Sequence, residues 1–211
     1  MAGSASVIED GSRLSRLDQM LLRVERALAL VSGLAVFMIM VFAVVSVSGR
    51  NFFNAPVPGY VDWIEQLMPF IAILGISYTQ RDGTHIRMDM IVGALRGRAL
   101  WAAEAITVFV MLVLMVLLIW GTWAHFQRSF DFAAPLWSRD SSIDIALPLW
   151  PAKLAVPLAF SVLALRLLIQ LWGYSRACWL GLYHPAAVPL IRSTAQIAAE
   201  EANAIGQERS R

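Results

Sequence analysis

Residues 27–49 read ALALVSGLAVFMIMVFAVVSVSG, a stretch without a single charged side chain. The stretch has no polar face at the helical period, as expected for a helix whose outer side meets lipid. A hydrocarbon core of about 30 Å requires about 20 mostly apolar residues per helix, and this run is long enough. It is too long for the core of a signal peptide, and no Ala-x-Ala-like cleavage site clearly follows it. We therefore expect it to remain in the chain as a signal anchor.

Three further apolar runs follow, among them AITVFVMLVLMVLLIWG at 105–121. Only 15% of the 211 residues are charged, against about 25% in typical globular domains. The core helices of a soluble bundle would show polar faces, which these runs lack. The expected fold class is an all-α integral membrane protein with four transmembrane helices, at 28–47, 61–78, 100–123 and 152–172.

The distribution of Lys and Arg predicts the orientation, because these residues accumulate on the cytoplasmic side. Four spans place both termini on the same side. That side collects twelve arginines, namely Arg13, Arg16, Arg23, Arg26, Arg81, Arg87, Arg96, Arg98, Arg176, Arg192, Arg209 and Arg211. The two opposite loops hold four basic residues, Arg50, Arg128, Arg139 and Lys153. We therefore expect both termini in the cytoplasm and a multi-pass protein of a bacterial inner membrane.

The segment RDGTHIRMDM at 81–90 is polar and lies between the second and third runs. Gly83 can end a helix, and Thr84 can cap the next one. Ile86, Met90 and their neighbours would form an apolar face, with His85, Arg87 and Asp89 among the polar positions. The pattern predicts a short amphipathic helix in the inner membrane interface, serving as a simple anchored connector or as a contact with a partner. The resulting organisation is a cytoplasmic N-terminal segment (1–26), a four-span membrane domain (27–173) and a cytoplasmic tail (174–211).

The order of several motifs resembles the DctQ family, the small membrane subunits of tripartite ATP-independent periplasmic (TRAP) transporters. These motifs are Arg50 after the first span, Glu65 within VDWIEQLMPFIAILGISY, the segment RDGTHIRMDMI, and the proline-marked start of the fourth span in IALPLWPAKLAVPL. The resemblance covers roughly residues 27–173. One departure is that Glu65 stands between Ile64 and Gln66, where many relatives have two adjacent acids.

The resemblance implies a scaffold subunit without catalytic residues, cofactor or metal. Such a subunit acts beside a large membrane subunit, which carries the substrate and ion sites, and a periplasmic substrate-binding protein. The transporter takes up organic acids in symport with an ion, usually sodium. The residues themselves leave two alternatives open: a generic four-span structural or assembly protein, and the membrane anchor of a redox enzyme. The second would need axial haem ligands within the spans, whereas His85, His125 and His184 fall at or beyond the span ends.

Ionisable residues inside apolar runs are candidate sites because their burial in lipid costs about 2.5–3.5 kcal/mol. Glu65 can be a hydrated acid near a helix N-terminus, a partner of Arg50, or a contact with the large subunit. Arg166 is expected to extend its side chain to the inner interface, or to meet Glu104. The candidate contact or structural residues are therefore Arg50, Glu65, His85, Arg87, Asp89 and Arg166.

The outer loop at 124–151 is much longer than the usual two to eight residues between helices. It is rich in aromatic residues, so we expect it to rest on the membrane or on the large subunit. Arg128, Arg139 and Trp137 are its candidate docking residues for the periplasmic protein. The sequence shows no basic, aromatic-interleaved patch, so we expect no nucleic acid among the partners, which otherwise include membrane lipid.

Overall fold

The computed structural model describes residues 13–55, 57–81 and 98–180, and within these ranges the fold is helical. The helices are α1 (Arg13–Phe53), α2 (Tyr60–Ile73), α3 (Ile76–Arg81), α5 (Arg98–Ser129) and α6 (Trp150–Leu180), with a short 3-10 turn η1 (Pro135–Trp137). The described ranges contain no strand, only isolated bridges from Phe130 to Ser138 and from Ser141 to Pro148. The expected all-α fold class is confirmed for this part of the chain.

Three of the helices are long and apolar enough to cross a membrane. These stretches are Leu14–Phe53 in α1, Ala99–Ser129 in α5 and Trp150–Leu180 in α6. They contain the first, third and fourth expected spans. Few residues in the most apolar parts of α1 and α5 are buried within the chain, so lipid or a partner protein must cover their exposed faces.

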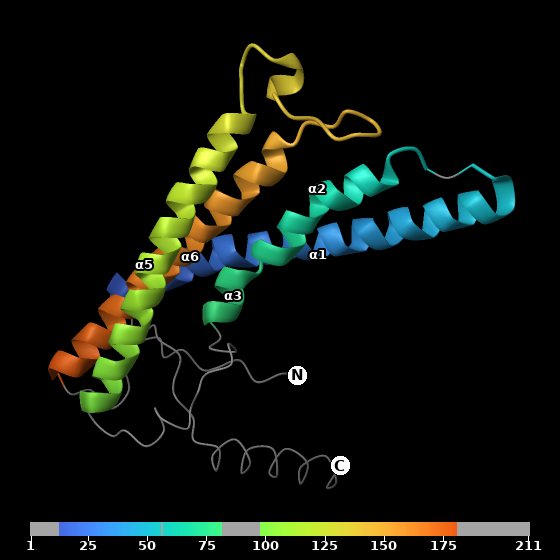
Figure 1. Ribbon diagram of the computed structural model, residues 1–211. Helices are drawn as coiled ribbons and strands as arrows, with labels where there is room; N and C mark the ends of the chain where they lie inside the picture. Colours follow the sequence, from blue (N-terminus) through green and yellow to red (C-terminus); the bar gives the residue numbers. More distant parts are fainter. Residues whose placement is uncertain (1–12, 56, 82–97, 181–211) are drawn as a thin grey trace, which may run out of the picture.

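The second expected span is divided between α2 and α3. The chain turns at Leu74 and Gly75 before the helix resumes at Ile76. Pro69 lacks the N–H that would bond back to the carbonyl of Glu65, and glycine is a poor helix former, so both residues weaken a continuous helix here. The break gives α3 a direction of its own (Figure 1).

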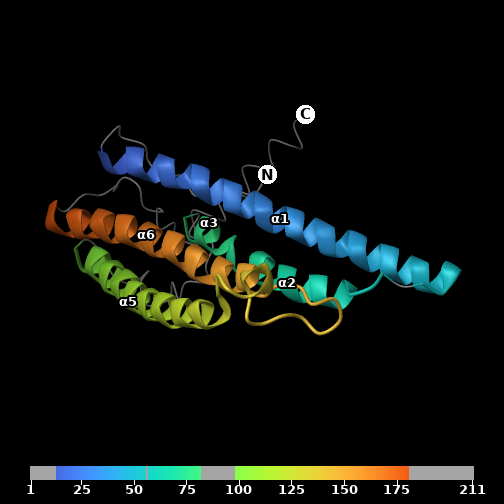
Figure 2. The same cartoon turned by 90° about the horizontal axis from the view of Figure 1, so that it is seen from above.

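The helices form a layered arrangement in which α6 lies between α5 and the N-terminal half of α1 (Figures 1 and 2). α5 and α6 run side by side along most of their length, and α2 follows the C-terminal half of α1. The α1–α2 contact includes a hydrogen bond of 3.1 Å from the Ser32 hydroxyl to the carbonyl of Ile71.

The apolar core lies between α5 and α6. On α6 the buried residues recur at helical spacing, namely Ala155, Ala159, Leu163, Leu167, Tyr174 and Ala177. The alanines allow close approach of the two helices. Toward the end of α6, Tyr174 stacks on Trp101 of α5 with ring centroids 6.0 Å apart. Because α5 and α6 share one continuous seam, the loop that joins their outer ends is held at a defined place.

α1 begins well before the apolar run that first suggested it. Its 41 residues correspond to about 60 Å, twice the thickness of a hydrocarbon core of about 30 Å. The helix therefore continues through the expected boundary at residue 27. The expected interfacial helix, with His85, Arg87 and Asp89, lies at 82–97, outside the described residues, as does the tail beyond Leu180.

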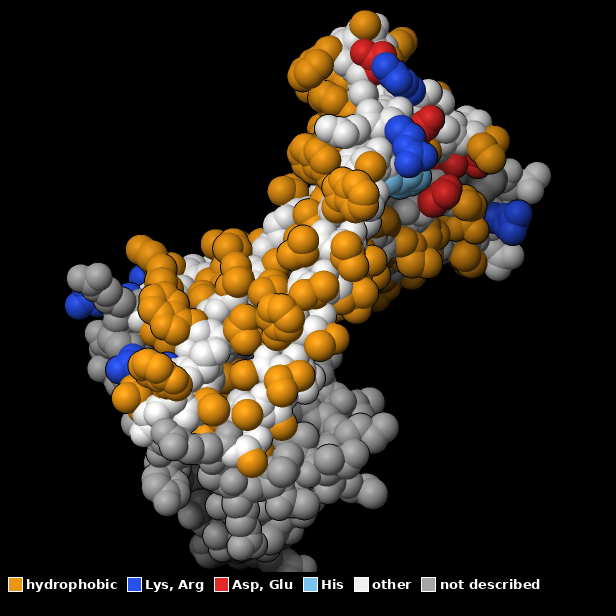
Figure 3. Space-filling model, turned by 60° about the vertical axis from the view of Figure 1, so that its left-hand side comes forward, with side chains coloured by type: hydrophobic (Ala, Val, Ile, Leu, Met, Phe, Trp, Pro, Cys, Tyr) orange, Lys and Arg blue, Asp and Glu red, His pale blue; other side chains and the backbone are white. Residues whose placement is uncertain are grey.

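Charged side chains gather near the ends of the molecule on the face shown in Figure 3. The body between these ends is covered by hydrophobic side chains. One charged group lies at the end of the molecule where Figure 1 shows the α5–α6 loop. An apolar band flanked by charged ends is the surface that a membrane-spanning protein presents to a bilayer.

Candidate functional site

Arg166, in the middle of α6, is fully buried and is bound by two carboxylates of α1. Its Nε donates to Oε1 of Glu25 at 2.8 Å, and one terminal nitrogen donates to Oε2 of the same carboxylate at 2.6 Å. The other terminal nitrogen donates to Oδ1 of Asp18. Such a two-pronged contact matches the planar guanidinium to the carboxylate and is among the stronger ion pairs in proteins. Glu25 is likewise fully buried, and Asp18 is 1% exposed.

α3 supplies the remaining members of this buried ion cluster. Arg81 donates to Oδ2 of Asp18 at 2.8 Å, and the Ser77 hydroxyl donates to Oε1 of Glu25 at 2.6 Å. Beside them, the Gln80 side chain donates to Oε1 of Gln170 at 3.0 Å. The two arginines and two carboxylates carry formal charges that cancel. The cluster therefore joins α1, α3 and α6 without a net charge.

Local helix geometry explains how these residues meet. Asp18 and Glu25 are seven residues apart on α1 and therefore share one face, as do Arg166 and Gln170, four apart on α6. The turn at Leu74 and Gly75 directs the polar side of α3 to the same place. Within LSRLDQMLLRVERAL, the seven-residue spacing of the acids is the sequence signal for this site. The sequence does not show that they face Arg166, because 141 or more residues separate them.

The expectation that Arg166 extends to the inner interface is wrong. Its side chain is 0% exposed, and its partners belong to α1 rather than being Glu104. Depth along α6 alone favours a path to the interface, but the neighbouring helix offers a closer partner. Two carboxylates within hydrogen-bonding distance compensate the lost hydration better than a partial path to the headgroups.

A second polar site, the Asp62 clamp, fixes the outer loop to the beginning of α2. Asp62 is 5% exposed. Its Oδ2 accepts hydrogen bonds from the Ser142 hydroxyl at 2.6 Å and from the backbone N–H groups of Asp144 at 3.1 Å and Ile145 at 2.9 Å. One turn further along α2, the Gln66 side chain donates to the carbonyl of Pro148 at 2.7 Å. Four hydrogen bonds thus join α2 to a loop some 80 residues away.

Gly59 allows this loop to approach so closely. It precedes α2 with a φ of 65°, a conformation that side chains rarely adopt. A Cβ at this position would also lie 2.6 Å from the side chain of Ile145. Both the backbone conformation and the space therefore require glycine.

The outer loop is folded onto itself, in agreement with its aromatic content. Phe130 contacts the rings of Phe126, Phe132 and Trp150, and the Trp150 indole N–H donates to the carbonyl of Leu136 at 3.1 Å. This aromatic cluster closes the outer end of the α5–α6 pair. Part of the loop is thereby covered by the chain itself.

One ion pair joins two parts of the loop, and another joins the loop to the first turn of α6. Arg139 pairs with Asp131 at 3.0 Å, and Lys153 pairs with Asp140 at 2.5 Å. The pKa of Asp131 lies below its ordinary value because the N–H of Ala133 donates to it and because Arg139 is near. The pKa of Asp140 is lowered mainly by Lys153. Both carboxyl groups therefore stay ionised at neutral pH.

The candidate residues that the sequence assigns to the outer side are exposed. Arg50 and Glu65 form no ion pair with each other or with other described residues. Of the three roles predicted for Glu65, the ion pair with Arg50 is therefore not formed in this structure. Arg50 lines a hollow of about 280 Å³ together with Ser46, Tyr60 and Asp144. Arg128 is exposed in the last turn of α5, Trp137 is exposed in the loop, and Arg139 is exposed apart from its contact with Asp131.

The long apolar helices, the charged ends and the folded outer loop together define an integral membrane protein of helical type. The chain matches the family model of the tripartite ATP-independent periplasmic transporters, DctQ component, over residues 37–177. That range is more than half of the chain, so the protein belongs to the DctQ family and is a small permease component of a TRAP transporter. No curated protein matches the chain. The matched range contains Arg81 and Arg166 but begins after Asp18 and Glu25.

The buried ion cluster generates a stability prediction. Replacing Glu25 by Gln leaves Arg166 fully buried with one shared carboxylate, so we expect a loss of about 3–5 kcal/mol. The double variant E25Q/R166M should lose less than the sum of the single variants because it leaves Asp18 and Arg81 paired. The measurement heats the full chain in detergent and records, at each temperature, the fraction of protein that stays monodisperse. R139Q, which removes an exposed ion pair, is the control and should change stability by less than about 1 kcal/mol. An E25Q protein as stable as the wild type would show that this cluster does not hold α1 on α6.

The Asp62 clamp generates a second prediction, on the order of the loop. D62A removes the acceptor of three hydrogen bonds, so we expect the loop to open and trypsin to cleave after Arg139 faster than in the wild type. E65Q, a change of an exposed acid one turn away, is the matched control and should leave the cleavage rate unchanged. Equal rates for D62A and the wild type would exclude a clamping role for Asp62.

Proposed function

We propose that this small permease component is a static scaffold for the large membrane subunit of a TRAP transporter. In this proposal the assembly takes up organic acids with the help of an ion gradient and a periplasmic substrate-binding protein. The family match carries the proposal. The extensive uncovered apolar faces of α1 and α5 support it, since a scaffold needs surface for a partner as well as for lipid.

The internal electrostatics support a static role. Each carboxylate of the buried ion cluster already accepts hydrogen bonds from arginine, so neither is left open for a transported ion. The cluster is electrically neutral and links three helices, which favours one fixed arrangement of the bundle. Arg50 and Glu65, exposed at the outer side, remain candidate contacts with the large subunit, and His85, Arg87 and Asp89 are candidate contacts at the other side.

In the proposed orientation, both termini lie in the cytoplasm of a bacterial cell, with four crossings of the inner membrane. α2 and α3 together provide the second crossing. The outer loop between α5 and α6 then lies in the periplasm. There its exposed Trp137 and the two arginines Arg128 and Arg139 can meet the substrate-binding protein.

Co-purification tests the proposed function directly. The chain should purify as a complex with a large membrane protein encoded beside it, and proteoliposomes of that complex should accumulate an organic acid only when the binding protein and an ion gradient are present. Uptake by the large subunit alone at the full rate would contradict the scaffold role.

Thiol labelling tests the orientation. Cys178 is half-buried and packs against the core between α5 and α6, so it is a poor probe. In a C178S background, a cysteine at the exposed Ser141 should react with a membrane-impermeant reagent in intact cells. A cysteine at the exposed Ser175 should react only after permeabilisation. The reverse order of labelling would overturn the orientation.

Charge reversal tests the docking proposal. R128E/R139E should raise the binding-protein concentration that gives half-maximal uptake, because complementary charges steer such encounters. The effect should shrink at high salt, since the screening length falls from about 10 Å at 0.1 M to about 3 Å at 1 M. D131N is the matched control, because it breaks the same ion pair to Arg139 without reversing a charge. An unchanged half-saturation point for the double reversal would remove these arginines from the docking surface.

A further inference from the structure

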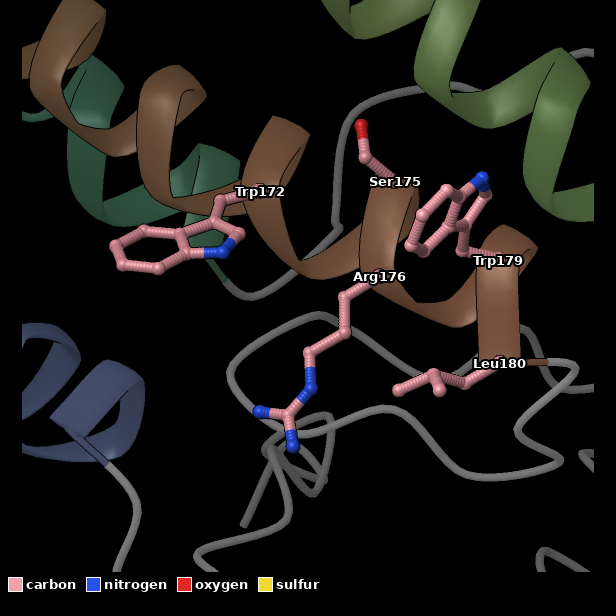
Figure 4. Close-up of a pocket in the computed structure, with 5 residues that line it drawn as sticks. All are labelled: Trp172, Ser175, Arg176, Trp179 and Leu180. Atoms are coloured by element: carbon pink, nitrogen blue, oxygen red, sulfur yellow. The ribbon is translucent and has the colours of Figure 1, made fainter.

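The last turns of α6 carry two tryptophans and an arginine on one side of the helix. Trp172, Arg176 and Trp179 follow one another at spacings of four and three residues, so they lie on neighbouring turns. With Ser175 and Leu180 they border a hollow of about 460 Å³. Arg176 leaves the helix between the two indole rings and points away from the helix axis (Figure 4).

The side chains on this side of α6 are largely exposed. Trp172 is 57% exposed, Trp179 86% and Leu180 59%. Arg176 is also exposed and forms no ion pair with a described residue, unlike Arg81, Arg139 and Arg166. An uncompensated guanidinium beside exposed indole rings is suited to a ligand with a negative group next to an apolar body.

The position of these residues along α6 indicates the depth at which such a ligand lies. The apolar run of α6 ends near Trp172, and Arg176 follows about 6 Å further along the helix. Indole rings favour the boundary between hydrocarbon and headgroups, and the phosphate groups lie just outside this boundary. When Trp172 lies at the boundary, the guanidinium is therefore at phosphate depth, and Trp179, about 4.5 Å further along the helix, lies in the headgroup region.

We infer that Arg176, Trp172 and Trp179 form a binding site for an anionic phospholipid of the inner leaflet. The guanidinium donates to the lipid phosphate in the forked geometry that suits phosphate oxygens. The Trp172 ring covers the glycerol region and the first carbons of an acyl chain, and Trp179 and Leu180 lie beside the headgroup. The assignment to the inner leaflet rests on the orientation proposed above. The binding chemistry itself rests on the residues of α6.

Native mass spectrometry of the full-length chain in detergent, with added phosphatidylglycerol or phosphatidylcholine, tests this site. The wild type should retain phosphatidylglycerol in preference to phosphatidylcholine. R176Q should lower the retained phosphatidylglycerol about fivefold, the value of one basic residue at an anionic surface, and leave phosphatidylcholine unchanged. R176K keeps the charge and should retain most of the binding. R128Q, at the far end of α5, should behave as the wild type.

Two outcomes would contradict the lipid site. Displacement of phosphatidylglycerol by an excess of inorganic phosphate would show that the site recognises free phosphate, and would overturn the lipid assignment. Equal retention of phosphatidylglycerol by R176Q and the wild type would remove Arg176 from the site. The measurement uses the isolated chain. The lipid site can therefore be refuted while co-purification and uptake support the scaffold role, and the scaffold role can be refuted while the lipid site is supported.

Discussion

A guanidinium buried in the middle of a membrane helix must find negative charge within reach, and much of this structure follows from how Arg166 meets that requirement. Its two carboxylates come from the part of α1 that precedes the apolar run. This part of α1 must therefore lie against α6. The second arginine, Arg81, balances the second acid and draws α3 to the same place. A single buried charge thus determines the neighbours of three helices.

Polar contacts hold both ends of the α2–α3 segment, which accepts hydrogen bonds at its beginning and donates them at its end. At its beginning, Asp62 accepts hydrogen bonds from a surface loop. At its end, Ser77 and Arg81 donate to acids in the interior. Between these points, contact with α1 is mostly apolar, apart from the hydrogen bond of Ser32. Because buried polar contacts tolerate little misplacement, this segment has a defined register along α1 and α6.

The sequence predicts features that depend on a single helix, but it does not predict which residues of two helices contact each other. The runs at 27–49 and 105–121 predict long helices because length and composition suffice. The aromatic residues of the α5–α6 loop predict contact with the membrane or the large subunit, whereas part of them pack against one another within the chain. The ion cluster is hidden, because helical periodicity shows that Asp18 and Glu25 share a face but not which helix they meet. The role of Asp62 is hidden too, since an acid in the first turn of a helix is usually solvated and its donors lie some 80 residues away. The division of the second span is partly visible in Pro69 and Gly75, although neither residue reveals the direction of α3.

The long separation between Glu25 and Arg166 has a consequence for how the protein is made. After Glu25 is incorporated, 141 further additions are needed to reach Arg166, and at about 5–20 residues per second the acid is without Arg166 for about 7–28 s. During this time Glu25 lacks its arginine and must remain hydrated, so we expect the N-terminal part of α1 to stay at the membrane surface while the later helices insert. It can settle against the bundle only after α6 arrives. The first helix to be synthesised is thus among the last to reach its final position, and a nascent chain cut short before Arg166 carries Glu25 without the arginine that pairs with it.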